Sequence, residues 1–138
     1  MTNDQFMIDP VREYLQEKGC GDHIISGGFV GLVENWEQVV ASVAQGYKFG
    51  LDDFLNDLDA RQLLEEVLSV ALPDEIQQQL ARIQAADAQM KALLLPAAEC
   101  LWGDEVAEEE GWTREQNWWY FGIPSNAGNA LRTELIAE

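Results

Sequence analysis

The sequence is poor in positive charge and in histidine. Eight lysine and arginine residues stand against 25 aspartate and glutamate residues, which gives a formal net charge of −17, and His23 is the single histidine. Such a surface repels the phosphates of nucleic acids and of anionic lipids, so direct binding to either is disfavoured. It favours a basic protein partner or cations, although the same charge also serves solubility alone.

Cysteines and long apolar runs are also scarce. The two cysteines, Cys20 and Cys100, are too few for a disulfide framework and are expected to be free thiols. The longest clearly apolar run, Ala92–Ala98, is far too short to cross a bilayer. The first residues lack the basic and apolar regions of a signal peptide. We therefore expect a cytoplasmic protein that does not bind membranes.

What is present is the composition of a folded helical domain. With 138 residues, 47% of them hydrophobic, the chain is long enough to bury one core. Apolar residues recur at helical spacing without a convincing alternating strand, which predicts an all-α single-domain bundle of about six helices. The expected helices are 10–18, 29–45, 51–58, 60–71, 73–103 with a kink or break at Pro96, 113–121 and 126–137. We expect residues 1–8 to form a flexible N-terminus, residues 20–28 a loop and residues 103–111 an acidic connection.

The stretch GLDDFLNDLDARQLLEEVL, residues 50–68, places acidic residues between two sets of leucines. On a helical wheel the first apolar set lies opposite an acidic ridge, which consists of Asp52, Asp53, Asn56 and Asp57. The second apolar set, which includes Leu64 and Val67, falls on the other face, so one straight helix could not bury both. A helix–helix corner is therefore expected near residues 58–60, with Asp59 as the N-cap of the second helix.

Asp87 interrupts the apolar stripe of the helix that is expected to begin at Pro73. An unpaired carboxylate at a buried position is costly, so Asp87 needs a partner or must become neutral. One interpretation is a carboxylate in a pocket that acts as an acid, a base or a ligand. The other is an internal salt bridge, for which the candidate partners are Arg12, Arg61 and Arg132.

Cys20 and His23, in the sequence C-G-D-H, form another candidate site. A thiol and an imidazole could supply half of a zinc site, or a nucleophile and its base. Zinc needs three or four protein ligands and only Cys100 could join them, so a loop cysteine and a structural histidine are favoured. The aspartates of residues 52–59 also fail the pattern of a calcium-binding loop, because hydrophobic residues occupy two ligand positions and the glycine is missing. We predict no metal site and no cofactor, and Asp87, Cys20 and His23 stay weak catalytic candidates.

The stretch GWTREQNWWYFGIP, residues 111–124, is unusually aromatic. Neighbouring side chains on a helix point in different directions, so its rings enter one core only if other elements cover the segment on several sides. Otherwise they form an exposed patch, which is typical of protein-interaction hot spots. The rings of this patch are Trp112, Trp118, Trp119 and Tyr120.

Three functions fit these observations. The first is a non-catalytic binding protein, such as an inhibitor, adaptor or immunity-like protein, that engages a basic partner through the acidic ridge and the aromatic rings. In size and acidity the chain resembles small acidic immunity proteins, although no motif is shared, and the resemblance implies a partner such as a basic nuclease toxin. The second is a small helical enzyme or ligand-binding domain that uses a buried carboxylate. The third is a structural subunit in which residues 118–121 form a homodimer interface.

Overall fold

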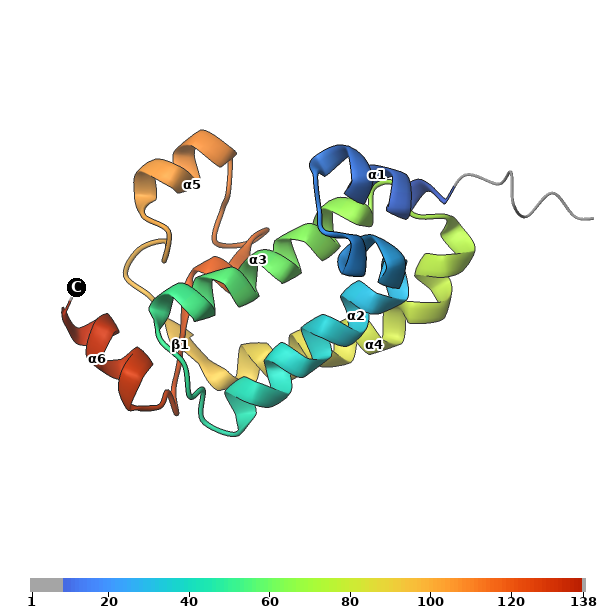
Figure 1. The fold of residues 1–138 in the computed structure, drawn as a ribbon. Helices are drawn as coiled ribbons and strands as arrows, with labels where there is room; N and C mark the ends of the chain where they lie inside the picture. The colour runs from blue at the N-terminus through green and yellow to red at the C-terminus, as the bar shows by residue number, and fades with distance from the viewer. Residues whose placement is uncertain (1–8, 138) are drawn as a thin grey trace, which may run out of the picture.

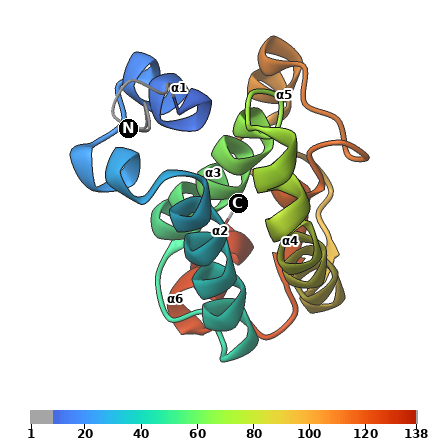
Figure 2. The same cartoon turned by 90° about the vertical axis from the view of Figure 1, so that its right-hand side faces the viewer.

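Three long helices form the centre of the computed structural model, which describes residues 9–137 (Figure 1). α2 (Asp22–Ala44) packs against both α3 (Leu51–Val67) and α4 (Pro73–Leu93), and Figure 2 shows α2 and α4 side by side. The shorter elements are α1 (Pro10–Lys18), β1 (Leu94–Pro96), α5 (Asp104–Glu110), the 3-10 helix η2 (Trp118–Tyr120), β2 (Gly122–Pro124) and α6 (Asn129–Ala137). Six α-helices account for most of the described residues, which confirms the predicted all-α class. The expected flexible N-terminus, residues 1–8, lies outside the described residues.

The helix predicted from residue 10 to residue 18 is confirmed with its caps. Asp9 Oδ1 accepts hydrogen bonds from the backbone amides of Val11 (3.0 Å) and Arg12 (3.3 Å), and Pro10 takes the first helical position. Gly19, with a φ of 86°, ends the helix in the left-handed conformation that glycine adopts without strain. These local signals alone are enough to fix the bounds of α1.

The loop expected at residues 20–28 is instead the beginning of α2. The helix starts at Asp22 and kinks at Gly28, whose φ of 60° and ψ of −153° are not helical. A kink leaves carbonyl oxygens without donors from the next turn, and the guanidinium of Arg12 supplies donors to them. Its Nε donates to the Ile25 oxygen (3.1 Å) and its Nη2 to the Ser26 oxygen (2.9 Å). The loop prediction is wrong because a side chain from α1 stabilises turns that would be weak on their own.

The corner predicted at residues 58–60 is also wrong, because α3 continues without interruption through this region. The buried positions of α3 drift around the helix, since α2, α6 and η2 cover different sides of it. These buried positions are Phe54, Leu55, Leu58, Arg61, Leu64 and Val67. Arg61 is only 4% exposed and joins the two leucine sets into one drifting stripe. Asp59, expected as an N-cap, therefore lies in the middle of a helix.

α4 ends at Leu93, so the helix expected to reach residue 103 is shorter than predicted. The next three residues form β1, which pairs antiparallel with β2. Proline disfavours the helical conformation at the residue before it, which helps to end α4 ahead of Pro96. A Cβ at Gly122 would come within 2.8 Å of the Leu94 side chain, so the close approach of the two strands favours glycine there.

The acidic connection expected at residues 103–111 contains a helix, α5. Asp104 and Glu105 lie in its first turn, where the partial positive charge of the helix end favours acidic side chains. Gly111, with a φ of 74°, ends the helix. The acidic composition that indicated a solvated connection is therefore compatible with a short helix at the surface.

The helix predicted over residues 113–121 is reduced to a turn and the short η2. The expected cap forms, because Thr113 Oγ1 accepts from the amide of Gln116 at 3.1 Å. The chain does not continue as an α-helix, because the buried Asn117 folds back onto the Thr113 amide (3.1 Å) and donates to Gln62 of α3 (2.9 Å). These bonds hold the aromatic segment against α3. The last helix, α6, begins at residue 129, three residues later than expected.

Candidate functional site

Asp87 lies at the junction of the three long helices, and both oxygens of its carboxylate accept hydrogen bonds. Arg61 of α3 donates through Nε to Oδ1 (2.9 Å) and through Nη2 to Oδ2 (2.8 Å), while Trp36 Nε1 of α2 donates to Oδ1 (2.9 Å). The Trp119 ring stacks over the guanidinium at 4.3 Å, and Glu65 Oε1 accepts from Arg61 Nη1 (3.0 Å). The carboxylate is therefore held in an internal salt bridge, which is the second of the two interpretations of Asp87.

Cys20 and His23 flank the start of α2. Cys20 is half-buried and packs against the core, whereas His23 is exposed in the first turn of the helix. Cys100 is buried elsewhere in the core, and burial raises the pKa of its thiol. Within residues 9–137, no group of three or more metal-ligating side chains is placed to hold an ion. Neither a nucleophile–base pair nor a zinc centre is supported by these positions.

Trp119 and Tyr120 are completely buried, so their predicted place in an exposed aromatic patch is wrong. Trp119 covers the guanidinium of Arg61, and the Tyr120 hydroxyl donates to Asp59 Oδ1 at 2.6 Å. The short η2 sends neighbouring rings in different directions, and surrounding elements cover them, as the core interpretation of this stretch requires. These two rings stabilise the molecule from inside.

Trp112 and Trp118, the other members of the predicted patch, are half-buried. Trp112 stacks on the Tyr120 ring, with centroids 4.1 Å apart, and Trp118 packs edge-on against Trp36 at 6.5 Å. The ammonium of Lys91 lies 4.9 Å from the centre of the Trp118 ring. Part of each indole therefore stays available at the surface, although the two do not form a patch with their neighbours in the sequence.

Of the four residues of the acidic ridge, three are exposed and Asp57 is not. Asp52, Asp53 and Asn56 are exposed, whereas Asp57 is half-buried and its Oδ2 accepts from the Tyr47 hydroxyl at 2.6 Å. Burial raises the pKa of Asp57, even though the hydrogen bond from Tyr47 opposes this rise. Burial and the same hydrogen bond raise the pKa of Tyr47, so its hydroxyl stays protonated and donates. The prediction that Asp57 points outward is wrong because α3 turns this position toward Tyr47.

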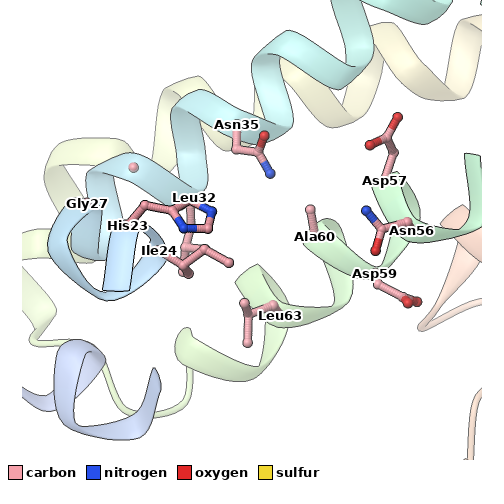
Figure 3. A pocket seen from close by; sticks show the side chains of 11 residues that line it. His23, Ile24, Gly27, Leu32, Asn35, Asn56, Asp57, Asp59, Ala60 and Leu63 are labelled. Carbon is pink, nitrogen blue, oxygen red and sulfur yellow. The ribbon is translucent and has the colours of Figure 1, made fainter. Parts of the chain in front are cut away.

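A groove of about 470 Å³ lies between the first half of α2 and the middle of α3 (Figure 3), and we call it the central groove. Its apolar side chains are buried or half-buried and form the floor: Ile24, Leu32, Ala60 and Leu63. Its polar side chains are mostly exposed and form the rim: His23, Asn35, Asn56, Asp57 and Asp59. Figure 3 shows the rim residues of α2 across from those of α3, with the Asp59 carboxylate turned away from His23.

Two glycines of α2 keep the central groove open. Gly27 and Gly31 line its wall on either side of residue 28, and a Cβ added at either position would meet nothing within 4 Å. Between them, the kink at Gly28 redirects the first turns of α2, which carry His23. The spacing of these glycines is the signal in the sequence from which the groove could have been suspected.

The central groove brings together only some of the residues singled out from the sequence. His23, Asn56 and Asp57 line it, whereas Asp87 and Cys20 do not. Asn35 and Leu63 also line it and carry no sequence signal of their own, because an asparagine and a leucine are ordinary residues of a surface helix. Their role follows from the packing of α2 against α3, which no local pattern defines.

Comparison with models of protein families, with curated protein sequences and with solved structures finds no match to this chain. None of the helices within residues 9–137 combines the length and the apolar character needed to cross a membrane. A functional conclusion therefore depends on the geometry and the charge of the chain itself.

Proposed function

We propose that this chain is a non-catalytic, acidic binding protein of the inhibitor, immunity-like or adaptor kind, and that it receives a basic segment of a partner protein in the central groove. The construction of the groove carries this proposal: an apolar floor with a rim of amides and carboxylates, in a chain of net charge −17. The apolar floor supplies contact area, while the acidic surroundings select a basic partner and speed its approach.

Binding is favoured over catalysis by the state of Asp87, the carboxylate that the enzyme hypothesis requires. Arg61 holds it in a bidentate ion pair and Trp36 donates a further hydrogen bond, so the group is already engaged when no substrate is bound. A general acid or base needs an oxygen that reaches the substrate. The internal contacts of Asp87 support a structural role instead.

A basic partner is favoured over a second copy of the chain. Two copies that each carry a net charge of −17 repel one another. A homodimer interface built from Trp119 and Tyr120 would require both rings at the surface of the single chain, and both lie in the core. The same charge disfavours nucleic acid. The free thiols of Cys20 and Cys100 support a reducing, cytoplasmic setting for the interaction.

The proposal is tested with the purified products of the neighbouring genes, since an inhibitor or immunity-like protein and its target are often encoded together. Binding is measured by calorimetry at about 0.05 M and about 0.5 M salt, which brackets weak and strong screening of surface charge. We expect one basic neighbour to bind, with an affinity that falls steeply as salt rises. Absence of binding to every basic neighbour at low salt contradicts the proposal.

A variant that fills the central groove locates the interaction. Gly31→Leu places a side chain in open space, and it replaces glycine within a helix, so the fold is expected to be at least as stable. Ala85→Leu on the exposed face of α4, outside the groove, is the matched control. We expect Gly31→Leu to weaken binding about tenfold or more, and Ala85→Leu to leave it unchanged. Equal affinities for the two variants place the partner elsewhere.

A further inference from the structure

A second groove, of about 450 Å³, lies on the other side of α3, toward α5, and we call it the aromatic groove. Three rings line it, from the segments that precede and follow α5: Trp102, Trp112 and Tyr120. Figure 1 shows α5 on the same side of the molecule as the middle of α3. Asp59 and Leu63 border both grooves. One extended segment of a partner could therefore cross α3 at these two residues and enter both.

Trp102 is the most exposed ring of the aromatic groove. Its side chain is 40% exposed, and its indole Nε1 donates to Asp59 Oδ1 at 3.1 Å, the same oxygen that accepts from Tyr120. An indole fixed in orientation while its ring meets solvent is the kind of residue that dominates protein interfaces. Trp112, stacked on Tyr120, presents a second ring to the same space.

The charges around the aromatic groove are mostly negative. Asp59, Glu66 and Glu110 line it, against the single cation Lys18. Glu66 is already engaged, because Oε1 accepts from Lys18 (2.7 Å) and from the Tyr14 hydroxyl (2.7 Å). In the described part of the chain, neither Asp59 Oδ2 nor the Glu110 carboxylate takes part in a hydrogen bond or an ion pair. Two carboxylates therefore remain for an incoming cation.

The chain repeatedly places its few cations over aromatic rings. Arg61 lies over Trp119 at 4.3 Å, and Lys91 lies over Trp118 at 4.9 Å. By contrast, within residues 9–137 no arginine or lysine lies over Trp102, or over Trp112 beside it. A guanidinium stacked on an indole and paired with a carboxylate combines a cation–π contact with an ion pair.

From these observations we infer that the aromatic groove receives an arginine side chain of the basic partner segment, stacked on Trp102 and paired with Glu110 or Asp59. This inference rests on the proposed function and adds to it the residue type that the partner must carry. Arginine is favoured over lysine because its planar guanidinium stacks on an indole and bridges two carboxylate oxygens, whereas an ammonium group does neither as well.

The test uses capped hexa-arginine and hexa-lysine peptides as probes, with binding measured by calorimetry at low salt. Trp102→Ala removes the ring and Glu110→Gln removes one carboxylate charge. Their controls are Phe49→Ala, an exposed ring outside both grooves, and Glu108→Gln, an exposed acid of α5 outside the groove. Thermal unfolding checks that each variant folds.

We expect wild-type protein to bind hexa-arginine more tightly than hexa-lysine, and Trp102→Ala to weaken hexa-arginine about threefold or more. The preference for arginine should shrink in this variant, and Glu110→Gln should weaken both peptides. Unchanged affinity for hexa-arginine in Trp102→Ala and Glu110→Gln overturns the inference.

The groove-filling Gly31→Leu variant separates this inference from the proposed function. If Gly31→Leu weakens peptide binding while Trp102→Ala and Glu110→Gln do not, the central groove binds basic segments and the inference about the aromatic groove is wrong. If Trp102→Ala weakens binding and Gly31→Leu does not, the arginine site stands and the central groove is not the site of the partner. If the peptides do not bind wild-type protein, the inference is also wrong.

Discussion

Asp87 and Asp59 are two carboxylates that accept a hydrogen bond from an indole, one inside the molecule and one at its surface. Asp87 accepts from Trp36 Nε1 at 2.9 Å and Asp59 accepts from Trp102 Nε1 at 3.1 Å. The inner carboxylate also meets Arg61, which is 4% exposed. Within the described residues, the outer carboxylate has no such cation, and its second oxygen enters no hydrogen bond.

The difference between these two sites lies in how each carboxylate is compensated. A carboxylate that is largely removed from water must be compensated within the chain, and Arg61 fulfils this requirement at Asp87, whose side chain is 17% exposed. An exposed carboxylate carries no such requirement and stays available to a partner. The indole–carboxylate pair of Trp36 and Asp87 is therefore part of the packed interior, whereas the pair of Trp102 and Asp59 leaves a carboxylate oxygen as an acceptor at the surface.

Among variants of the two sites, Asp87→Ala is expected to lower the free energy of unfolding the most. It removes the bidentate partner of the buried Arg61 guanidinium, which then keeps only the exposed Glu65, and we expect a loss of about 3 kcal/mol in the free energy of unfolding. Asp59→Ala, by contrast, removes only the acceptor of Tyr120 and Trp102 and should cost below about 2 kcal/mol. Urea unfolding followed by circular dichroism measures both. Equal losses for the two variants would mean that Asp87 is no more internal than Asp59.

A smaller effect is expected from Tyr120→Phe, which removes the buried hydroxyl that donates to the outer carboxylate, Asp59. The ring stays in the core, while the 2.6 Å hydrogen bond to Asp59 disappears, so we expect a loss of about 1.5 kcal/mol. Tyr14→Phe removes the hydroxyl that donates to Glu66 at the half-buried end of α3 and should cost less. Thermal unfolding of the two variants gives the order, and the reverse order would contradict the internal position of Tyr120.

The smallest effects concern pH and two further carboxylates of α3. Burial raises the pKa of Asp57, so ionisation of this group opposes folding above that pKa. The pKa of Glu66 is lowered, because hydrogen bonds from Lys18, Tyr14 and Gln62 outweigh the effect of burial. Its contribution to stability is present above the pKa of the unfolded chain and is lost as pH falls through the folded pKa.

Asp57→Asn should therefore raise the free energy of unfolding at neutral pH, and Glu66→Gln should lower it. The difference for Glu66→Gln should shrink as pH falls through the folded pKa of Glu66, and the difference for Asp57→Asn should shrink as pH falls below the pKa of Asp57 in the unfolded chain. Urea unfolding at neutral and acid pH checks the two signs. A loss of stability in Asp57→Asn at neutral pH would show that Asp57 stabilises the fold as an anion.

Local chemistry was sufficient to predict α1, which a cap and a proline begin, and the apolar face of α2, which a helical stripe of apolar residues marks. It failed in α3 because Arg61, a residue type usually found at the surface, is buried against Asp87 and Trp119. β1 and β2 were missed because three-residue strands carry almost no periodic signal and pair across a long stretch of chain. The two grooves depend on packing between helices, which the sequence pattern does not define. Of the residues that line them, the candidates named from the sequence are His23, Asn56, Asp57, Trp112 and Tyr120. None of these was predicted to line a groove.

The most direct measurement follows the indole N–H signals of the tryptophans by two-dimensional NMR while hexa-arginine peptide is added. If the site at Asp59 is accessible to the peptide and the site at Asp87 is not, the Trp102 signal should shift progressively and saturate. The Trp36 signal, from the indole that donates to Asp87, should stay in place. A Trp102 signal that does not move at saturating peptide, or a Trp36 signal that moves with it, would contradict the distinction between the two sites.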